Sequence, residues 1–135
     1  MGAPYCGAYF ATMALAGADK ISMLDTATTN YAGYAIYQSN TPVKVLLYNS
    51  DYYTTGTRST QTFTLVGLSG DSVTAKRLTA PASRQDQGQN PTVGGQTFTN
   101  GTCAIQGTAE TETNTVSSGV GTFALAASEA LLVYL

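Results

Sequence analysis

The sequence predicts a mainly β protein: an antiparallel β-sandwich of about eight strands, preceded by one short N-terminal helix. Two observations lead to this fold class. Short segments rich in β-branched, aromatic and leucine residues recur along the chain, and Gly, Asn, Asp, Ser and Pro fill the stretches between them. Only 10% of the 135 residues are charged, and Thr, Ser, Gly and Asn take the polar positions instead, a composition typical of secreted β proteins.

The helix is predicted over residues 5–15, because large side chains recur there at helical spacing. They form two neighbouring stripes, one of Tyr5, Tyr9 and Met13 and one of Cys6, Phe10 and Ala14. A helix that is apolar nearly all round is normally buried on several sides. We therefore expect residues 1–18 to be the remnant of a preceding domain and residues 19–135 to form the sandwich, with part of the helix left uncovered.

The eight predicted strands cover residues 21–24, 31–37, 43–48, 60–68, 73–78, 96–103, 121–126 and 130–135. In residues 43–48 the alternation gives way to an apolar run interrupted only by Lys44, as expected of a central strand covered on both faces. The best patterned strands predict a core shared by two sheets: Ile36, Val45, Leu47, Phe63, Leu65, Leu78, Phe123, Leu131 and Val133. Replacing a core residue such as Leu65 by alanine is expected to cost about 2–5 kcal/mol.

Charge and composition exclude several function classes. With a net charge of -2 and only six basic residues, the chain has no patch that could neutralise a run of phosphates, so neither nucleic acid nor an anionic membrane is an expected partner. Pro4, Gly7 and Gly17 interrupt the apolar N-terminal segment and argue against a transmembrane span. The chain has no His and two Cys, which excludes His-based triads and zinc sites, so we expect no metal and no cofactor.

Cysteine usage and one short motif favour a secreted protein. Cys6 and Cys103 lie far apart in the sequence, and in an oxidising compartment they could form a disulfide that ties the helix to a later strand. Two unrelated buried thiols are the alternative. Asn100-Gly101-Thr102 is an acceptor tripeptide for N-glycosylation and predicts a surface turn.

Two acidic residues raise the question of catalysis. Glu110 and Glu112 flank Thr111, and paired carboxylates are the machinery of glycoside hydrolysis. Both lie in a polar run without apolar neighbours, which favours a solvated face or loop, so no catalytic residue is predicted. Gly94 and Gly95 precede a strand segment without the lysine of a phosphate loop, and they indicate a bulge or a tight entry into that strand.

Aromatic residues in a loop are the candidates for sugar contact, because flat rings stack on the apolar faces of pyranoses. Tyr52 and Tyr53 follow a turn-forming stretch that begins at Asn49. For both tyrosines, surface binding, an interdomain contact and loop packing stay open. Asn49 is a third candidate for carbohydrate contact, and otherwise a turn former.

Several segments, taken in order, resemble the C-terminal β-domain of family 79 glycoside hydrolases, the group that holds β-glucuronidases and is related to heparanases. The matching segments are Pro4-Tyr5 and residues 33–37, 45–49, 76–80, 94–98 and 128–133. The resemblance implies a β-domain that packs against a catalytic (β/α)8 barrel, with the opening segment as the last helix of that barrel.

This resemblance also implies what the chain lacks. The two catalytic glutamates of the family lie at barrel strand ends, and Glu110, Glu112 and Glu129 match neither of them. We therefore expect a non-catalytic accessory domain of a β-glucuronidase-like hydrolase, which braces the barrel and shapes one wall of the substrate cleft. The alternative is an independent carbohydrate-binding or adhesive β-sandwich.

Overall fold

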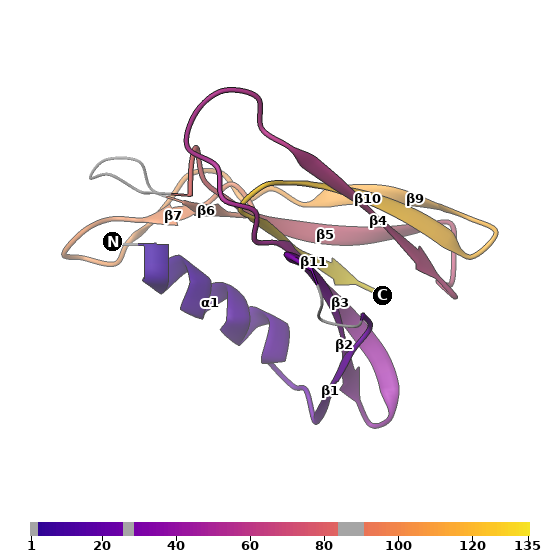
Figure 1. Ribbon diagram of the computed structural model, residues 1–135. Helices are drawn as coiled ribbons and strands as arrows, with labels where there is room; N and C mark the ends of the chain where they lie inside the picture. The colour runs from indigo at the N-terminus through magenta and orange to yellow at the C-terminus, as the bar shows by residue number, and fades with distance from the viewer. Residues whose placement is uncertain (1–2, 26–28, 84–90) are drawn as a thin grey trace.

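The computed structural model describes residues 3–25, 29–83 and 91–135 (Figure 1). Its one helix in those ranges, α1, spans Ala3–Leu15. The strands are β1 (Lys20–Met23), β2 (Tyr31–Gln38), β3 (Thr41–Asn49), β4 (Thr60–Val66), β5 (Ser72–Thr79), β6 (Thr92–Val93), β7 (Thr97–Phe98), β8 (Ile105–Gln106), β9 (Glu112–Ser117), β10 (Val120–Ala126) and β11 (Glu129–Tyr134). The prediction of a mainly β fold with one N-terminal helix is confirmed.

Two strand predictions need correction. The strand expected over residues 96–103 is a short hairpin instead, in which β7 turns back through residues 99–104 into β8. Glu112, expected on a solvated face or in a loop, begins β9, an unpredicted strand that pairs with β5 and β10. The Gly, Ser and Pro content of residues 81–91 also predicts a long polar loop, most of which lies outside the described residues.

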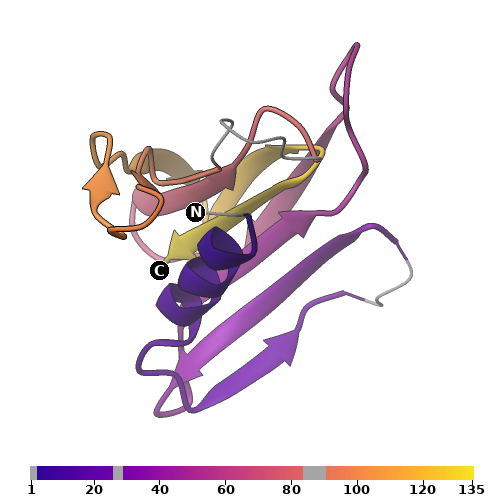
Figure 2. The ribbon, with the colours of Figure 1, turned by 90° about the vertical axis from the view of Figure 1, so that its left-hand side faces the viewer.

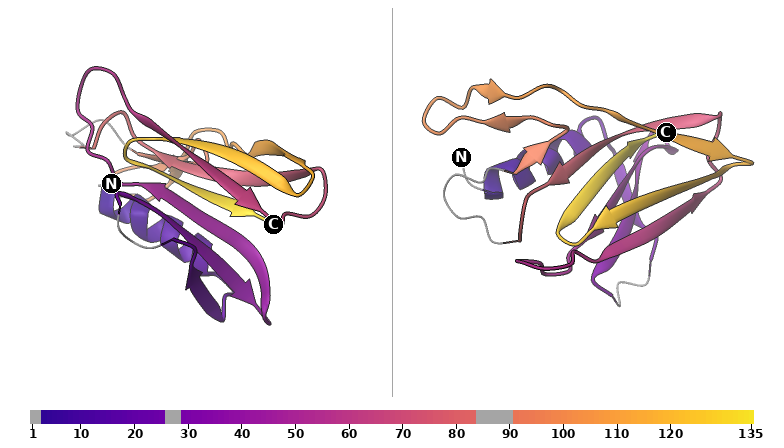
Figure 3. Two further views of the ribbon diagram at one scale, coloured as in Figure 1. Left: turned by 45° about the vertical axis from the view of Figure 1, so that its right-hand side comes forward. Right: turned by 90° about the horizontal axis from the view of Figure 1, so that it is seen from above.

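The sheet is continuous and curls over on itself. Eight of the described strands follow one another in the order β1-β2-β3-β11-β5-β9-β10-β4, and β6 pairs with β5. Because β9 pairs with both β5 and β10, the layer of β4 and β10 folds back over β3 and β11 (Figures 1 and 3). The sandwich therefore has two layers, but they belong to one curled antiparallel sheet rather than to two separate sheets.

The inner core lies between the two layers. Its buried residues are Val45, Leu47, Val73, Ala75, Val116, Phe123, Leu125, Leu131 and Val133. Phe63 and Leu65, which the pattern placed in the core, are only partly buried because they lie on β4, the strand at the end of the sheet. Leu65→Ala is therefore expected to cost less than the 2–5 kcal/mol of a fully buried leucine.

A second, outer core lies between the sheet and α1, which crosses one face of the sheet (Figure 2). Its buried residues are Cys6, Phe10, Ala14, Ile36, Val93, Phe98 and Leu132. Ile36 and the partly buried Leu78 belong to this outer core, so their assignment to the inner core was wrong. Leu131 points inward while Leu132 packs against the helix, which explains the unbroken apolar runs of the central strands.

Lys44 ties the C-terminal end of α1 to the sheet. Its ammonium group donates hydrogen bonds to three carbonyl oxygens: Met13 O at 2.9 Å, Ala14 O at 3.2 Å and Ala16 O at 3.0 Å. These carbonyls have no partner within the helix, and the helix dipole favours a positive charge beside them. The lysine therefore both caps the helix and attaches it to β3.

Replacing Lys44 by methionine is expected to lower the free energy of unfolding by about 2 kcal/mol, because three charge-assisted hydrogen bonds are lost while the alkyl chain is kept. Urea denaturation of the purified chain measures the loss. Lys20→Met is the matched control: Lys20 is exposed and lies 5.0 Å from the Tyr37 ring, so its replacement should cost less than about 1 kcal/mol. Equal losses would mean that the contacts of Lys44 with the helix carry no net stability.

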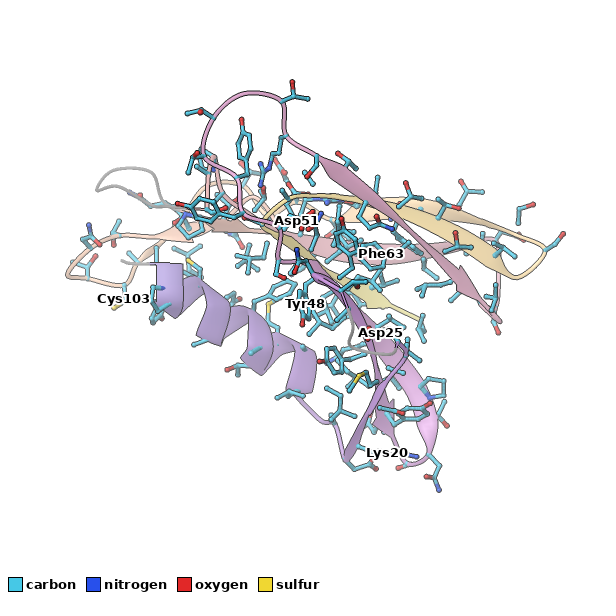
Figure 4. The ribbon with its side chains drawn as sticks, in the orientation of Figure 1. Lys20, Asp25, Tyr48, Asp51, Phe63 and Cys103 are labelled. Carbon is cyan, nitrogen blue, oxygen red and sulfur yellow. The ribbon has the colours of Figure 1, made fainter. Side chains whose placement is uncertain are left out.

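The predicted disulfide is not formed. Both cysteines are free thiols: Cys6 is buried and Cys103 is exposed. Cys6 points into the outer core, where its thiol lies 3.6 Å from the carbonyl oxygen of Pro91. Cys103 lies in the turn of the β7–β8 hairpin with φ of 57° (Figure 4). The alternative of two buried thiols holds for Cys6 alone, and Lys44 provides the attachment expected of the disulfide.

The two thiols should react at very different rates. Burial raises the pKa of the Cys6 thiol above its ordinary value, and the thiolate is the reactive form. With a maleimide reagent at neutral pH, we expect one fast modification at Cys103 and modification of Cys6 only after denaturation. Cys103→Ser should remove the fast phase. A fast reaction at Cys6 in that variant would show that α1 does not stay docked on the sheet.

Candidate functional site

One end of the sandwich carries the loop of residues 50–59, which holds the predicted sugar-contact residues. Asn49, the last residue of β3, is only 1% exposed. Its amide nitrogen donates to Leu125 O at 3.2 Å, and its amide oxygen accepts from the Asp51 backbone N–H at 3.0 Å. Asn49 therefore joins the two layers and starts the loop. As a contact to sugar the prediction was wrong, because the side chain is buried and already paired.

Tyr53 is used to shape the loop. Its hydroxyl donates to Gly56 O at 3.0 Å, and the Arg58 guanidinium lies 5.3 Å from the centre of its ring. Its backbone N–H donates to the Ser83 hydroxyl at 2.7 Å, and its carbonyl accepts from the Ser83 N–H at 2.7 Å. Of the alternatives open for Tyr53, loop packing is what the structure shows.

Tyr52 differs from its neighbour, because its side chain is 70% exposed. The loop beneath it is fixed at several points. Arg58 donates two hydrogen bonds to Ala127 O, at 2.9 and 2.6 Å, and the Ser128 hydroxyl donates to Asp51 O at 2.8 Å and is hydrogen-bonded to the Ser83 hydroxyl. An exposed ring is thus held on a well-supported loop, an arrangement suited to contact with another molecule or domain. Sugar contact by Tyr52 stays a prediction.

Asp51 connects the loop to β2. Its carboxylate accepts from the Asn30 amide at 2.8 Å and from the Tyr31 hydroxyl at 3.0 Å. The hydrogen bond to Asp51 raises the pKa of Tyr31 above its ordinary value. Tyr31 in turn meets Phe63 of the other layer, which Figure 4 labels, edge-to-face. The loop, β2 and β4 are therefore linked at this end of the molecule.

An ion-pair network lies beneath the loop. Arg77 of β5 donates to both carboxylate oxygens of Glu112, at 2.6 and 2.9 Å, and to Glu129 at 2.6 Å. Glu129 also accepts from the Thr79 hydroxyl at 2.7 Å and from the Ala126 N–H at 3.0 Å. The bond to Glu112 raises the pKa of Arg77 further above its ordinary value. This network joins β5, β9 and β11 and corrects the expectation that Glu112 is merely solvated.

Glu110 and Glu112 are not a catalytic pair in this arrangement. Glu112 is held by Arg77, whereas Glu110 is exposed and its backbone N–H donates to Gly94 O at 2.7 Å.

Gly94 has φ of 53°, and a Cβ there would lie 2.8 Å from Glu110 O, so the tight entry into β7 expected at Gly94 and Gly95 is confirmed. Within the described residues, no group of His, Cys, Asp and Glu side chains could hold a metal ion.

A groove of about 300 Å³ opens where the two layers splay apart. Tyr31 and Leu47 line it on one side, and Phe63 and Leu65 line it on the other. Asp25 borders the groove, and its carboxylate accepts a hydrogen bond from the Gly33 N–H at 2.6 Å. The lining is mostly apolar and does not combine a free acid with a free base, so it lacks the groups for general acid–base catalysis.

The helix-bearing side of the molecule carries an apolar surface. We call Tyr5, Tyr9, Leu15, Ile21 and Met23 the outer apolar face; each is 36–50% exposed. Ile21 and Met23 lie directly opposite Ile36 and Tyr34, so they share the face that α1 covers. Beside them the ring of Tyr34 stacks on that of Tyr48, which Figure 4 labels, with centroids 6.3 Å apart.

Sequence reasoning found part of this surface. The uncovered side of the helix was expected, and Tyr5, Tyr9 and Leu15 are indeed exposed. The contribution of β1 was missed, although the alternation of Ile21 and Met23 with polar Lys20 and Ser22 could have indicated it. Along the described part of the chain, no helix is long and apolar enough to span a membrane.

Comparisons with known proteins agree with the fold and the segment order. The family model of the glycosyl hydrolase family 79 C-terminal beta domain matches residues 33–132. The crystal structure of a novel 4-O-α-L-rhamnosyl-β-D-glucuronidase from Fusarium oxysporum 12S, in complex with Rha-GlcA, is 66% identical to the chain with a TM-score of 0.98. That match covers 100% of this chain and 30% of the other. No curated protein matches. The chain therefore belongs to the C-terminal β-domain family of family 79 glycosyl hydrolases, and the catalytic domain is not in this sequence.

Proposed function

We propose that this chain serves as the accessory β-domain of a glucuronidase-like glycoside hydrolase and braces the catalytic barrel through its outer apolar face. The observation that carries the proposal is this face itself, formed by α1 and β1. Contiguous apolar surface on a soluble protein commonly marks an interface. The similar rhamnosyl-glucuronidase has a chain of which this domain matches only 30%, so a partner for the face is expected within the same polypeptide.

The electrostatics of the face suit such a contact. None of its five members is charged, and Lys44, a cation on the helix side, is already bonded to carbonyl oxygens at the end of the helix. Burial of the face against a barrel would therefore leave none of these six residues with an unpaired charge. Tyr5 and Tyr9 already contact Phe98 edge-on, at 5.0 and 5.1 Å between ring centres, which gives the surface a defined shape.

A chimera tests this interface. The matching part of the rhamnosyl-glucuronidase is replaced by this chain, and Met23→Asp is introduced. We expect the variant to lose roughly 2 kcal/mol of stability or more, the usual loss at an interface hot spot, together with activity. The isolated chain should be little affected, because Met23 lies on the edge strand β1.

Val66→Asp is the matched control for this chimera. Val66 is 76% exposed and lies on β4, away from the outer apolar face. We expect it to leave the stability and activity of the chimera nearly unchanged. If Met23→Asp is as harmless as Val66→Asp in the chimera, the barrel does not rest on this face and the proposal is wrong.

The loop of residues 50–59 supports a second part of the proposal, that the domain shapes one wall of the substrate cleft. Tyr52 is exposed while the loop beneath it is held by Arg58 and Ser128. In the chimera, Tyr52→Ala is expected to raise KM about tenfold with little change in kcat, as loss of a stacking contact would. Tyr53→Phe, which removes only the bond to Gly56, is the control.

The same exposed ring favours the alternative of an independent carbohydrate-binding module. Binding of the isolated chain to an immobilised glucuronic-acid polysaccharide, abolished by Tyr52→Ala, would support that alternative. No binding by the isolated chain, with a KM effect in the chimera, would support the accessory domain.

The isolated chain is expected to hydrolyse no p-nitrophenyl β-glucuronide. Glycoside cleavage needs a general acid in a water-excluding site and a second carboxylate across the sugar ring. Here Glu112 and Glu129 are held by Arg77, and Glu110 is exposed. The assay compares the purified chain with its Glu110→Gln and Glu112→Gln variants. Turnover by the parent that disappears in either variant would contradict the accessory role.

A further inference from the structure

We propose that Asn100 carries an N-linked glycan, added in a secretory compartment, at the tip of the β7–β8 hairpin. Asn100-Gly101-Thr102 is the only Asn-x-Ser/Thr tripeptide in the 135 residues in which x is not proline. Asn90-Pro91-Thr92 has the spacing, but its proline blocks the modification. The proposal does not depend on the barrel, so it can fail while the proposed function holds.

The tripeptide is exposed on a surface turn, as a glycosylation acceptor must be. Residues 100–104 are all exposed, and no hydrogen bond joins the Asn100 side chain to any described residue. The turn beneath it is well supported: the Thr99 N–H donates to Ala104 O at 2.9 Å, the Cys103 N–H donates to Thr99 O at 3.2 Å, and the Thr99 and Thr102 hydroxyls are 2.5 Å apart. Gly101 supplies the positive φ of 86° that the turn requires.

The base of the hairpin fixes where the glycan would lie. Phe98 is buried between the sheet and α1 and contacts the rings of Tyr5 and Tyr9. The tip therefore projects beyond the N-terminal end of the helix, where Cys103 is seen in Figure 4. A hydrated oligosaccharide at this position would extend into solvent without displacing a core residue.

The modification is a group transfer from a lipid-diphosphate-linked oligosaccharide. The amide nitrogen of Asn100 forms a bond to C1 of the first sugar, and the bond between C1 and the diphosphate oxygen breaks. Lipid diphosphate leaves, and the amide loses one proton to solvent. No oxidant or reductant is needed.

The residues around Asn100 indicate what the glycan would do. Cys103 is an exposed free thiol, and Ile105 is 59% exposed at the same hairpin. Cys6 is buried in the outer core, so in an oxidising compartment Cys103 could pair only with a cysteine outside this sequence. A glycan on Asn100 would cover the Cys103 thiol and the apolar Ile105 side chain beside it.

Expression of the chain behind a cleavable secretion signal in a yeast host tests the site. We expect the secreted product to lose mass on digestion with peptide N-glycosidase. The digestion converts the glycosylated Asn100 to aspartate, so when it is carried out in heavy-oxygen water, residue 100 should carry the oxygen label. Thr102→Ser should keep the glycan, whereas Asn100→Gln should abolish it. Translation in the presence of microsomes supplies a second readout: a protease-protected product with unmodified Asn100 would overturn the proposal.

Thiol modification tests the protective role. Reaction of Cys103 with a polymer-linked maleimide should be several-fold slower in the glycosylated chain than in the Asn100→Gln variant, and the variant should form more disulfide-linked dimer. Cys103→Ser in the Asn100→Gln background should abolish the dimer. Equal rates with and without the glycan would overturn the shielding role.

Discussion

Replacing Phe123 by alanine is expected to lower the free energy of unfolding by about 3–5 kcal/mol, the range for a buried phenylalanine. Phe123 lies on β10, opposite Phe63 of β4, and is 1% exposed. It belongs to the inner core that holds the two layers of the curled sheet together. The substitution removes a whole ring from that core. Because the core is closely packed, the neighbouring side chains fill the resulting space only in part. Urea denaturation of the purified chain measures the loss.

Leu65→Ala is the informative comparison for this variant. Leu65 packs against the same core but is only partly buried, since β4 ends the sheet. We expect its replacement to cost about 1–2 kcal/mol, below the full range for a buried leucine. Losses of equal size at Phe123 and Leu65 would mean that side chains are packed as tightly at β4 as in the centre of the core.

The second large effect is expected at Arg77. Arg77→Met should lower the free energy of unfolding by about 3 kcal/mol, because it removes the cation that pairs with Glu112 and Glu129 at 2.6 Å and leaves Glu129 only the longer 4.0 Å contact with Arg58. The side chain of Glu129 is only 11% exposed, so water replaces the guanidinium poorly. Denaturation at neutral pH provides the measurement.

Further variants separate the ion pairs from packing. Lys76→Met, on the next residue of β5 but pointing to the opposite face, should cost less than about 1 kcal/mol. Glu129→Gln in the Arg77→Met background should recover part of the lost stability, since it removes a carboxylate that Arg58 alone, 4.0 Å away, compensates incompletely. If the double variant is less stable than Arg77→Met alone, the loss at Arg77 reflects packing rather than charge.

Local patterns in the sequence were enough to predict most elements. Helical spacing identified residues 5–15, and period-two alternation or apolar runs identified the strands that became β2, β3, β4, β5, β10 and β11. The order of several short segments indicated the family, which the match over residues 33–132 shows. β9 was missed because Val116 is its single buried apolar residue and its other positions are polar.

The partners of individual side chains were not predictable in the same way. The sequence marked Cys6 and Cys103 as a candidate pair, Asn49 as a candidate for carbohydrate contact and Glu112 as solvated, and the structure places each of them differently. Arg77 and Glu112 are 35 positions apart, and Lys44 meets the helix from 28 to 31 positions away.

What the sequence determined by itself was the type and order of the elements, because periodicity depends on the spacing of residues within one segment. The tertiary structure decided which faces are covered, which charges meet and which residues remain exposed. These depend on strand register and on the curl introduced where β9 pairs with both β5 and β10. A shift of one residue in any of these pairings would turn its side chains to the opposite face, and no local pattern records that choice.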